Sequence, residues 1–356
     1  MSDSIPAGSV PAQSKPAGGD RISSLDGLRA ISIVMVLLGH LGGTRGFPGV
    51  NLGVGDYAHL GVVVFFVISG FLITRLLLTE HTKKGHVSLK LFYARRALRL
   101  FPAAYAYIAC IALLALAGVV HLAARDFWHA LTYTANYLPR PAWEIGHLWS
   151  LSVEEQFYLL WPCAIVALGP RRALWVAAGV ILLGPFARSA DWFFLTGTPY
   201  RDLSMFPMVA DSLAMGCLLA RVRGWLELQG WYLQLFQPAY SAGLLALILL
   251  INRFMGYMVV EVFGTSAINV CLAILIHRCV YCSHDWIGRA LNWKPIAFVG
   301  VLSYSLYLWQ QPFLDRHSNA WVNAFPQNLV LAVAAALASY LLLEKPLLRL
   351  RQRLRS

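Results

Sequence analysis

Long apolar runs separated by short polar connections follow one another along the chain from residue 27 onward. Ten runs are candidate membrane helices, because about 20 apolar residues span a bilayer as an α-helix. They cover residues 27–44, 59–78, 101–120, 148–168, 173–190, 205–220, 239–255, 258–280, 296–314 and 327–344. This pattern predicts an all-α fold: a polytopic membrane helical bundle with about ten transmembrane helices.

The composition supports the same class of protein. Of the 356 residues, 58% are hydrophobic and only 13% are charged, with a mean hydropathy of +0.60. A soluble protein carries about 25% charged residues. The expected surroundings of the chain are therefore a lipid bilayer.

The placement of the basic residues predicts the orientation. If the ten runs cross the membrane in turn, 22 of the 29 Lys and Arg residues fall on the side of the N-terminus. Cytoplasmic connections carry the excess of Lys and Arg in membrane proteins. Both termini are therefore predicted to be cytoplasmic. Topology accounts for most of the +12 net charge, so no nucleic-acid partner is inferred.

The polar ends of the chain delimit one membrane domain. Residues 1–20 are rich in Pro, Gly, Ser and Ala and are expected to form a disordered cytoplasmic tail. Residues 21–345 would form the membrane domain, and residues 346–356 a basic cytoplasmic tail. The predicted extracytoplasmic connections are too short to fold independently. Any chemistry is therefore expected among the helices or at their ends.

The first apolar run carries an ionisable residue. His40 lies eleven residues after Arg29, which corresponds to roughly 16 Å along a helix. An ionisable side chain at that depth is costly and points to function. The structural alternative is a histidine that caps the helix or bonds a neighbouring helix.

A basic segment precedes the third apolar run. Arg95, Arg96 and Arg99 lie within about one turn of a predicted amphipathic helix on the cytoplasmic side. Guanidinium groups at this spacing suit a phosphate. The alternative is an anchor that touches anionic lipid head groups.

Two consecutive acids stand near the start of the fourth run. Glu154 and Glu155 point about 100° apart on a helix, so at most one faces a given neighbour. A carboxylate can orient an imidazole and raise its basicity. The alternative is a favourable interaction of the acids with the helix N-terminus.

Four common catalytic sequence motifs are absent from the chain. The chain has no GxSxG, Walker, GxGxxG or HExxH motif, which argues against an elbow-type hydrolase, an ATPase and a zincin.

Cys279 and Cys282 form a CVYC pair, but no second pair or histidine cluster completes a site, so no metal is expected. Ser69 with Gly70 suits a small-residue helix contact.

Six segments in order resemble one family. They are SLDGLRAISIVMVLLGH, FFVISGFLI, FYARRALRLFPA, HLWSLSVEEQFYLLWP, MVADSLAMGCLLA and VGVLSYSLYLWQQPF. Together they resemble the membrane acyltransferase-3 family of bacterial proteins, which transfer acyl groups, often acetyl, to glycans, lipids or small molecules. The resemblance implies a location in the bacterial inner membrane and acyl-coenzyme A, most simply acetyl-CoA, as the donor.

The resemblance also implies roles for individual residues. The implied catalytic residues are His40, Arg29, Glu154 and Glu155; the donor-binding ones are Arg96, Arg99 and Ser69; the substrate-binding ones are Asp211, Tyr307 and Gln310. The family often has His where this chain has Gln310, and a basic residue where it has Val209. Some relatives carry a hydrolase-like domain after the last helix. Here transfer is expected to be complete within the membrane domain or to use a separate partner.

Two functions from different classes follow. In the first, an acyltransferase uses His40 as general base on an acceptor hydroxyl, with Glu154 or Glu155 orienting the ring. A variant of this mechanism has His40 briefly carrying the acyl group. In the second, a transporter or exporter uses His40 and the acids as a proton relay. Dependence on acyl-coenzyme A separates the two.

Overall fold

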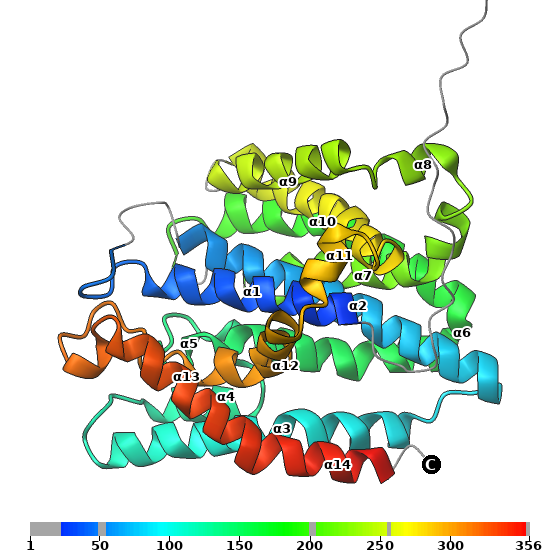
Figure 1. The fold of residues 1–356 in the computed structure, drawn as a ribbon. Helices are drawn as coiled ribbons and strands as arrows, with labels where there is room; N and C mark the ends of the chain where they lie inside the picture. Colours follow the sequence, from blue (N-terminus) through cyan, green and yellow to red (C-terminus); the bar gives the residue numbers. More distant parts are fainter. Residues whose placement is uncertain (1–22, 49–54, 199–203, 255–257, 354–356) are drawn as a thin grey trace, which may run out of the picture.

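The computed structural model describes residues 23–48, 55–198, 204–254 and 258–353. Within these ranges the chain is helical and contains no β-strand, which confirms the all-α fold class (Figure 1). The predicted tail at residues 1–20 lies outside the described residues. Much of the predicted C-terminal tail belongs to the last helix, α14 (Lys345–Arg353).

The longer helices form the bundle, and short helical segments connect them. The α-helices are α1 (Ser23–Leu41), α2 (Gly55–Lys84), α3 (Leu89–Leu116), α4 (Ala124–Leu131), α5 (Trp143–Gly146), α6 (Leu148–Ala190), α7 (Phe206–Leu226), α8 (Gly230–Gln234), α9 (Pro238–Arg253), α10 (Thr265–Tyr281), α11 (Trp286–Leu291), α12 (Lys294–Trp309), α13 (Gln327–Ser339) and α14. Two 3₁₀ segments are η1 (Ala135–Tyr137) and η4 (Trp321–Asn323), and three π segments are η2 (Asp191–Leu195), η3 (Val260–Gly264) and η5 (Tyr340–Glu344).

All ten predicted runs lie mainly in helices over their described residues, but the count of about ten membrane spans is not confirmed. Among the described residues, six helices are long and apolar enough to cross a membrane. One of these six covers 53 residues and includes α6, which breaks at Gly169 with φ of 78°. This left-handed conformation favours glycine, and it divides α6 between the fourth and fifth predicted runs. Both α9 and α12 have 16 residues, about 24 Å, which is shorter than the hydrocarbon core.

Local sequence signals set several helix starts. Pro occupies the first or second position of α7, α9 and α12, where its missing N–H is not needed. The hydroxyl of Ser88 accepts a hydrogen bond from the N–H of Leu91 and caps α3. The basic segment and the third predicted run therefore form one continuous helix that passes through Pro102.

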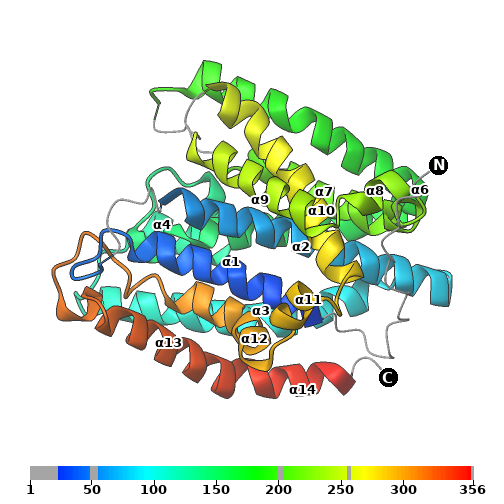
Figure 2. The same ribbon diagram turned by 45° about the horizontal axis from the view of Figure 1, so that its top comes forward.

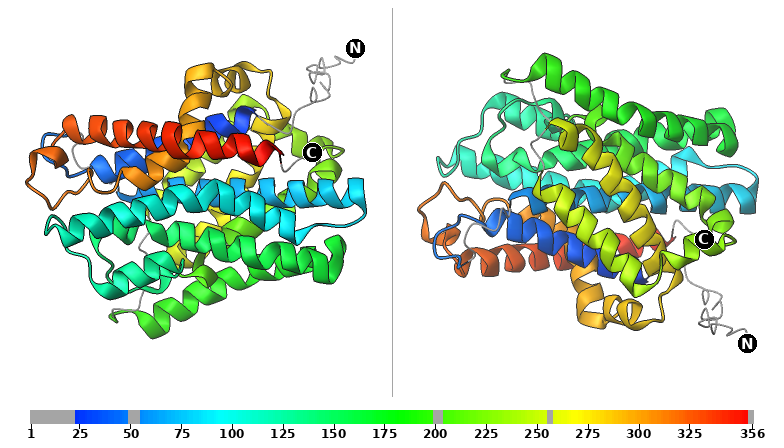
Figure 3. Two further views of the ribbon diagram at one scale, coloured as in Figure 1. Left: turned by 90° about the horizontal axis from the view of Figure 1, so that it is seen from below. Right: turned by 90° about the horizontal axis from the view of Figure 1, so that it is seen from above.

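The helix α2 lies at the centre of the bundle and contacts α1, α6, α7, α9 and α10. It approaches α7 closely because glycines lie at the contact. A Cβ on Gly70 would collide with the carbonyl oxygen of Leu213, and one on Gly216 with that of Val67. This confirms the predicted small-residue contact at Gly70. Figures 2 and 3 show α13 and α14 along one flank of the bundle and α6 along the other.

The two ends of the bundle differ. The start of α1, the connection between α2 and α3, and the end of α14 all point toward one end of the bundle (Figure 1). The connections that follow α1 and α12 lie at the opposite end. Arg29 and His40 therefore occupy different depths along α1, with Arg29 toward the first end and His40 toward the second.

Candidate active site

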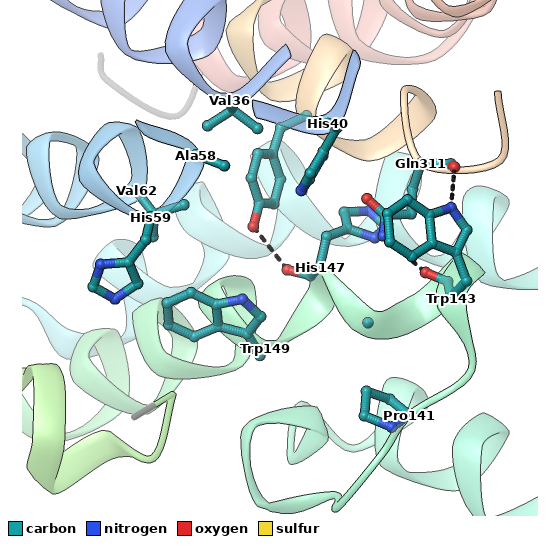
Figure 4. Close-up of a pocket in the computed structure, with 12 residues that line it drawn as sticks. Val36, His40, Ala58, His59, Val62, Pro141, Trp143, His147, Trp149 and Gln311 are labelled. Atoms are coloured by element: carbon teal, nitrogen blue, oxygen red, sulfur yellow. Dashed lines mark hydrogen bonds between the residues drawn. The ribbon is translucent and has the colours of Figure 1, made fainter. Parts of the chain in front are cut away.

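A cavity of about 320 Å³ lies near the second end of the bundle. It is bounded by α1, α2, the segment around α5 and the end of α12. Its walls carry His40, His59, Trp143, His147, Trp149, Tyr307 and Gln311, together with Val36, Ala58, Val62, Pro141 and Gly146. Figure 4 shows His59 and Trp149 toward one side of the cavity, Trp143 and His147 toward the other, and His40 entering from α1.

His40 is held by neighbours from two other segments. Its Nδ1 lies 2.7 Å from Oε1 of Gln310, which follows α12. Its ring meets the indole of Trp143 edge-on, with centroids 5.8 Å apart. His40 thus lies in the last turn of α1 with one ring nitrogen engaged and its ring on the cavity wall.

A second histidine shares this cavity. His147 is 4% exposed and is flanked by the rings of Tyr107 and Tyr307, each with its centroid 5.4 Å away. Among the described residues neither ring nitrogen has a hydrogen-bond partner, and the ring lies near the backbone of Leu308 and near His40. His147 is not among the residues predicted from the sequence. The sequence feature that could have indicated His147 is its position at the start of the HLWS segment, directly before α6.

Tyr307 lines the cavity, but its hydroxyl is engaged with the start of α6. The hydroxyl donates to the carbonyl oxygen of His147 at 2.8 Å and lies 2.5 Å from Oγ of Ser150. Tyr307 was expected to bind substrate. Its ring remains on the cavity wall, while its polar atom ties α12 to α6.

The two glutamates lie deeper along α6. Seven residues separate Glu154 from His147, about 10 Å along the helix. The carboxylate of Glu154 accepts a hydrogen bond from Ser69 at 2.6 Å and interacts electrostatically with Arg29 and Arg96. Within the described part of the chain, no hydrogen bond or ion pair joins either glutamate to His40. The side chain that contacts the ring is Gln310.

Glu155 points to another side of α6, as consecutive helix residues must. Its Oε1 is buried and has no hydrogen-bond partner in the described part of the chain. It interacts electrostatically with Glu154 and with Arg96. Both glutamates therefore belong to the surroundings of the arginines rather than to the imidazole.

Three arginines interact with one another and form what we call the arginine cluster: Arg29, Arg96 and Arg99. Two of them, Arg29 and Arg96, also interact with Glu154. Arg29 lies 3.6 Å from Asp26 and interacts with Arg99 and Glu154. The guanidinium of Arg96 lies over the ring of Tyr158, 4.8 Å from its centroid. The predicted partnership of Arg29 with His40 is not a contact, because the two lie three turns apart on α1.

The remaining predicted residues lie apart from the cavity or are engaged within the protein. Ser69 donates a hydrogen bond to Glu154, which interacts with Arg29 and Arg96, so Ser69 lies near the arginine cluster. Asp211 is 1% exposed and pairs with Arg188 in the interior. Cys279 and Cys282 are free thiols.

The fold and the site define a multi-pass membrane protein whose helices enclose a histidine-lined cavity and a cluster of arginines at different depths. A family model described as an acyltransferase domain matches residues 22–344. The chain belongs to this family, which confirms the resemblance to the membrane acyltransferase-3 proteins.

Similar proteins of known name cover most of this chain. The peptidoglycan O-acetyltransferase OatA of Listeria monocytogenes is 27% identical over 333 residues, 82% of this chain and 49% of the relative. The O-acetyltransferase OatA of Staphylococcus aureus is 27% identical over 367 residues, 92% of this chain and 57% of the relative. The chain thus spans about half the length of the curated relatives it matches. No solved structure matches.

Proposed function

We propose that the chain transfers an acyl group, most simply acetyl, from acyl-coenzyme A to a hydroxyl group of a carbohydrate. Membership of the acyltransferase family supports the reaction type. One observation carries the proposal: a histidine-lined cavity and an arginine cluster lie at two depths of one bundle, roughly 16 Å apart along α1. A donor and an acceptor can then approach from opposite faces of the membrane.

The arginine cluster suits an anionic donor. Arg29, Arg96 and Arg99 supply three positive charges, and Glu154 interacts with the first two. Guanidinium groups bind phosphate oxygens through paired, charge-assisted hydrogen bonds. The cluster lies toward the end of the bundle where the basic connection and α14 are found, which we assign to the cytoplasm. Coenzyme A carries phosphates for this cluster and presents its acyl group as an activated thioester.

His40 supplies the proton transfer. One ring nitrogen, Nδ1, bonds Gln310, so Nε2 is the nitrogen that acts on the acceptor. As the hydroxyl oxygen bonds to the acyl carbon, Nε2 takes the hydroxyl proton and then returns it to the departing thiolate. General-base catalysis of this kind contributes about 10²–10⁴-fold. In a two-step variant Nε2 attacks the thioester first, which breaks the C–S bond and releases the coenzyme A thiolate. Nε2 then passes the acyl group to the hydroxyl, whose proton goes to that thiolate.

The cavity wall suits a sugar ring. Trp143, Trp149 and His59 present flat aromatic surfaces beside His40. Sugar rings have apolar faces that pack against such surfaces and hydroxyls that reach polar groups. The name of the Listeria monocytogenes relative specifies peptidoglycan, so the first acceptor to test is the glycan strand of peptidoglycan. This acceptor would reach the cavity from the outer face of the bacterial cytoplasmic membrane.

The test is acyl transfer by the purified full chain in lipid nanodiscs. Radiolabelled acetyl-CoA is supplied with peptidoglycan fragments, and labelled product is counted for the native chain, His40→Ala and His81→Ala. His81 is the matched control because it lies at the end of α2, outside the cavity. We expect product from the native chain and His81→Ala, and a loss of at least about 10²-fold in His40→Ala. Full activity in His40→Ala, or no acyl-coenzyme A-dependent product from the native chain with any carbohydrate, contradicts the proposal.

A further inference from the structure

Gln310 and Gln311 connect His40 to a main-chain carbonyl through a row of hydrogen bonds. Nδ1 of His40 lies 2.7 Å from Oε1 of Gln310, and Nε2 of Gln310 lies 2.9 Å from Oε1 of Gln311. Nε2 of Gln311 lies 2.8 Å from the carbonyl oxygen of Trp143. The indole Nε1–H of Trp143 donates back to the main-chain carbonyl of Gln311 at 2.8 Å. Gln311 and Trp143 therefore exchange two hydrogen bonds at the end of the row that is farther from His40.

The carbonyl of Trp143 fixes the direction of this row. A carbonyl oxygen only accepts hydrogen bonds, so the atom of Gln311 that faces it must be the donor Nε2. Oε1 of Gln311 then faces Gln310 and requires a donor there, which is Nε2 of Gln310. Oε1 of Gln310 is left facing His40, and Nδ1 must carry the proton of that hydrogen bond.

Burial keeps the row from reversing. Gln310 is 0% exposed, and Gln311, on the cavity wall, is 3% exposed, and both amides are engaged by partners within the protein. Reversing Gln311 would place its oxygen against the oxygen of Trp143. A buried polar group left without a partner costs about 1–3 kcal/mol. One orientation of both amides, and hence one imidazole tautomer, is favoured over the other.

We propose that Gln310 and Gln311 are positioning residues that hold His40 in the Nδ1–H tautomer and leave the Nε2 lone pair facing the cavity. The effect of this tautomer on catalysis rests on the proposed acyl transfer, whereas the assignment of the tautomer is independent of that function. The assignment gives Gln310 a role different from the expected binding of substrate, because its amide oxygen is engaged with His40 and its amide nitrogen with Gln311. For acyl transfer, the two hydrogen bonds keep Nε2 of His40 unprotonated and able to accept the hydroxyl proton before the acceptor binds.

The first test reads the tautomer without any activity. The chain is labelled with ¹⁵N-histidine, placed in nanodiscs and studied by NMR, and the His40 signals are assigned by their loss in His40→Gln. We expect Nδ1 to be the protonated nitrogen and Nε2 the unprotonated one in the native chain. We expect Gln310→Met to convert this pattern into a mixture of both tautomers. A proton on Nε2 in the native chain, or an unchanged pattern in Gln310→Met, overturns the proposal.

The second test separates positioning from substrate binding. We expect Gln310→Met to lower kcat by about 10²-fold, as misplacement of a catalytic group does, with the KM values for donor and acceptor little changed. Gln310→Glu keeps an oxygen acceptor toward Nδ1–H and should recover much of this loss. Asn328→Leu is the matched control, because it removes a buried amide that bonds Thr44 and Asn323 instead of His40.

The outcomes of the two tests are distinguishable. A Gln310→Met variant that loses only affinity for the acceptor would overturn the positioning role and restore the substrate-binding interpretation. An inactive native chain with the expected tautomer would refute the proposed function and leave the tautomer assignment standing. A native chain that is active while Gln310→Met keeps its kcat would refute the positioning role alone.

Discussion

Arg188 and Asp211 form an ion pair in the interior, with Nη2 and Oδ2 3.0 Å apart and neither side chain more than 2% exposed. Arg188 also donates to Ser266 and to the carbonyl oxygens of Met208 and Val262. This guanidinium therefore joins the second half of α6 to α7, η3 and α10. The pair anchors one flank of the bundle rather than the cavity.

Removing one partner of this pair should destabilise the protein strongly. Asp211→Ala leaves Arg188 as a buried charge without its counterion, which costs about 3–5 kcal/mol. We expect a lower Tm for Asp211→Ala and for Arg188→Ala, and a double variant less destabilised than the sum of the two. Thermal unfolding of all four proteins in one detergent measures the coupling.

The same variants test the expected role of Asp211 in substrate binding. If Asp211 is structural, the folded fraction of Asp211→Ala retains the native KM for the acceptor. A variant with normal Tm and a raised KM would support substrate binding and contradict the structural role.

The sequence indicated Asp211 but could not indicate its partner. Arg188 and Asp211 are 23 residues apart, and a loop separates the helices that carry them. Periodicity along one helix predicts which face a residue occupies, but not which neighbour that face meets. For the same reason the glutamates were expected beside His40, whereas the fold brings Gln310 there. The depth of His40 was predictable because it depends on one segment, and the basic end of the bundle was predictable because it depends on charge counted over the connections. Gly70 indicated a close helix contact but not its partner Leu213.

Neighbouring arginines at the start of α3 should differ in their effect on donor binding. Arg95 is paired with Glu80 at 3.2 Å, whereas Arg96 lies over Tyr158 beside Glu154. We expect Arg96→Ala to weaken acyl-coenzyme A binding by about 10-fold or more, the equivalent of one charge-assisted hydrogen bond. Isothermal titration of acetyl-CoA against the chain in nanodiscs measures this loss.

Arg95→Ala is the matched control for that measurement. It removes the same charge from the same helix and should change donor affinity little. Equal losses in both variants would indicate a general effect of basic charge at the membrane surface, as for an anchor on anionic lipid. Adding salt should weaken binding to the native chain only modestly, since the partly buried arginines are screened less than exposed charges.

Close packing of α2 against α7 should make Gly70 intolerant of any side chain. In Gly70→Ala the new Cβ meets the main-chain oxygen of Leu213, which cannot move without separating the helices. We expect a fall in Tm, because overpacking costs about 1–3 kcal/mol. Gly179→Ala is the control, since nothing lies within 4 Å of its Cβ position on α6. That variant should be neutral or slightly stabilising, and an equal fall in both would contradict the close contact.

Trp149 should contribute to binding the acceptor rather than to chemistry. Its indole stacks on His59, with centroids 6.1 Å apart and planes 12° apart, and it lies on the cavity wall opposite Trp143 (Figure 4). Favourable aromatic contacts are worth about 0.5–1.5 kcal/mol beyond their buried area. Trp149→Ala should therefore raise the KM for a carbohydrate acceptor by about 3- to 10-fold or more, with the KM for acetyl-CoA unchanged.

Trp149→Phe should keep most of that affinity, because a flat ring remains on the wall. Trp175→Ala is the matched control: that indole is 79% exposed on the outer surface of α6, away from the cavity. The measurement is steady-state acyl transfer with acceptor and donor varied in turn. A loss confined to the donor KM would place the acceptor elsewhere. If Trp149→Ala lowers kcat while leaving both KM values unchanged, Trp149 instead supports the geometry of the nearby catalytic groups.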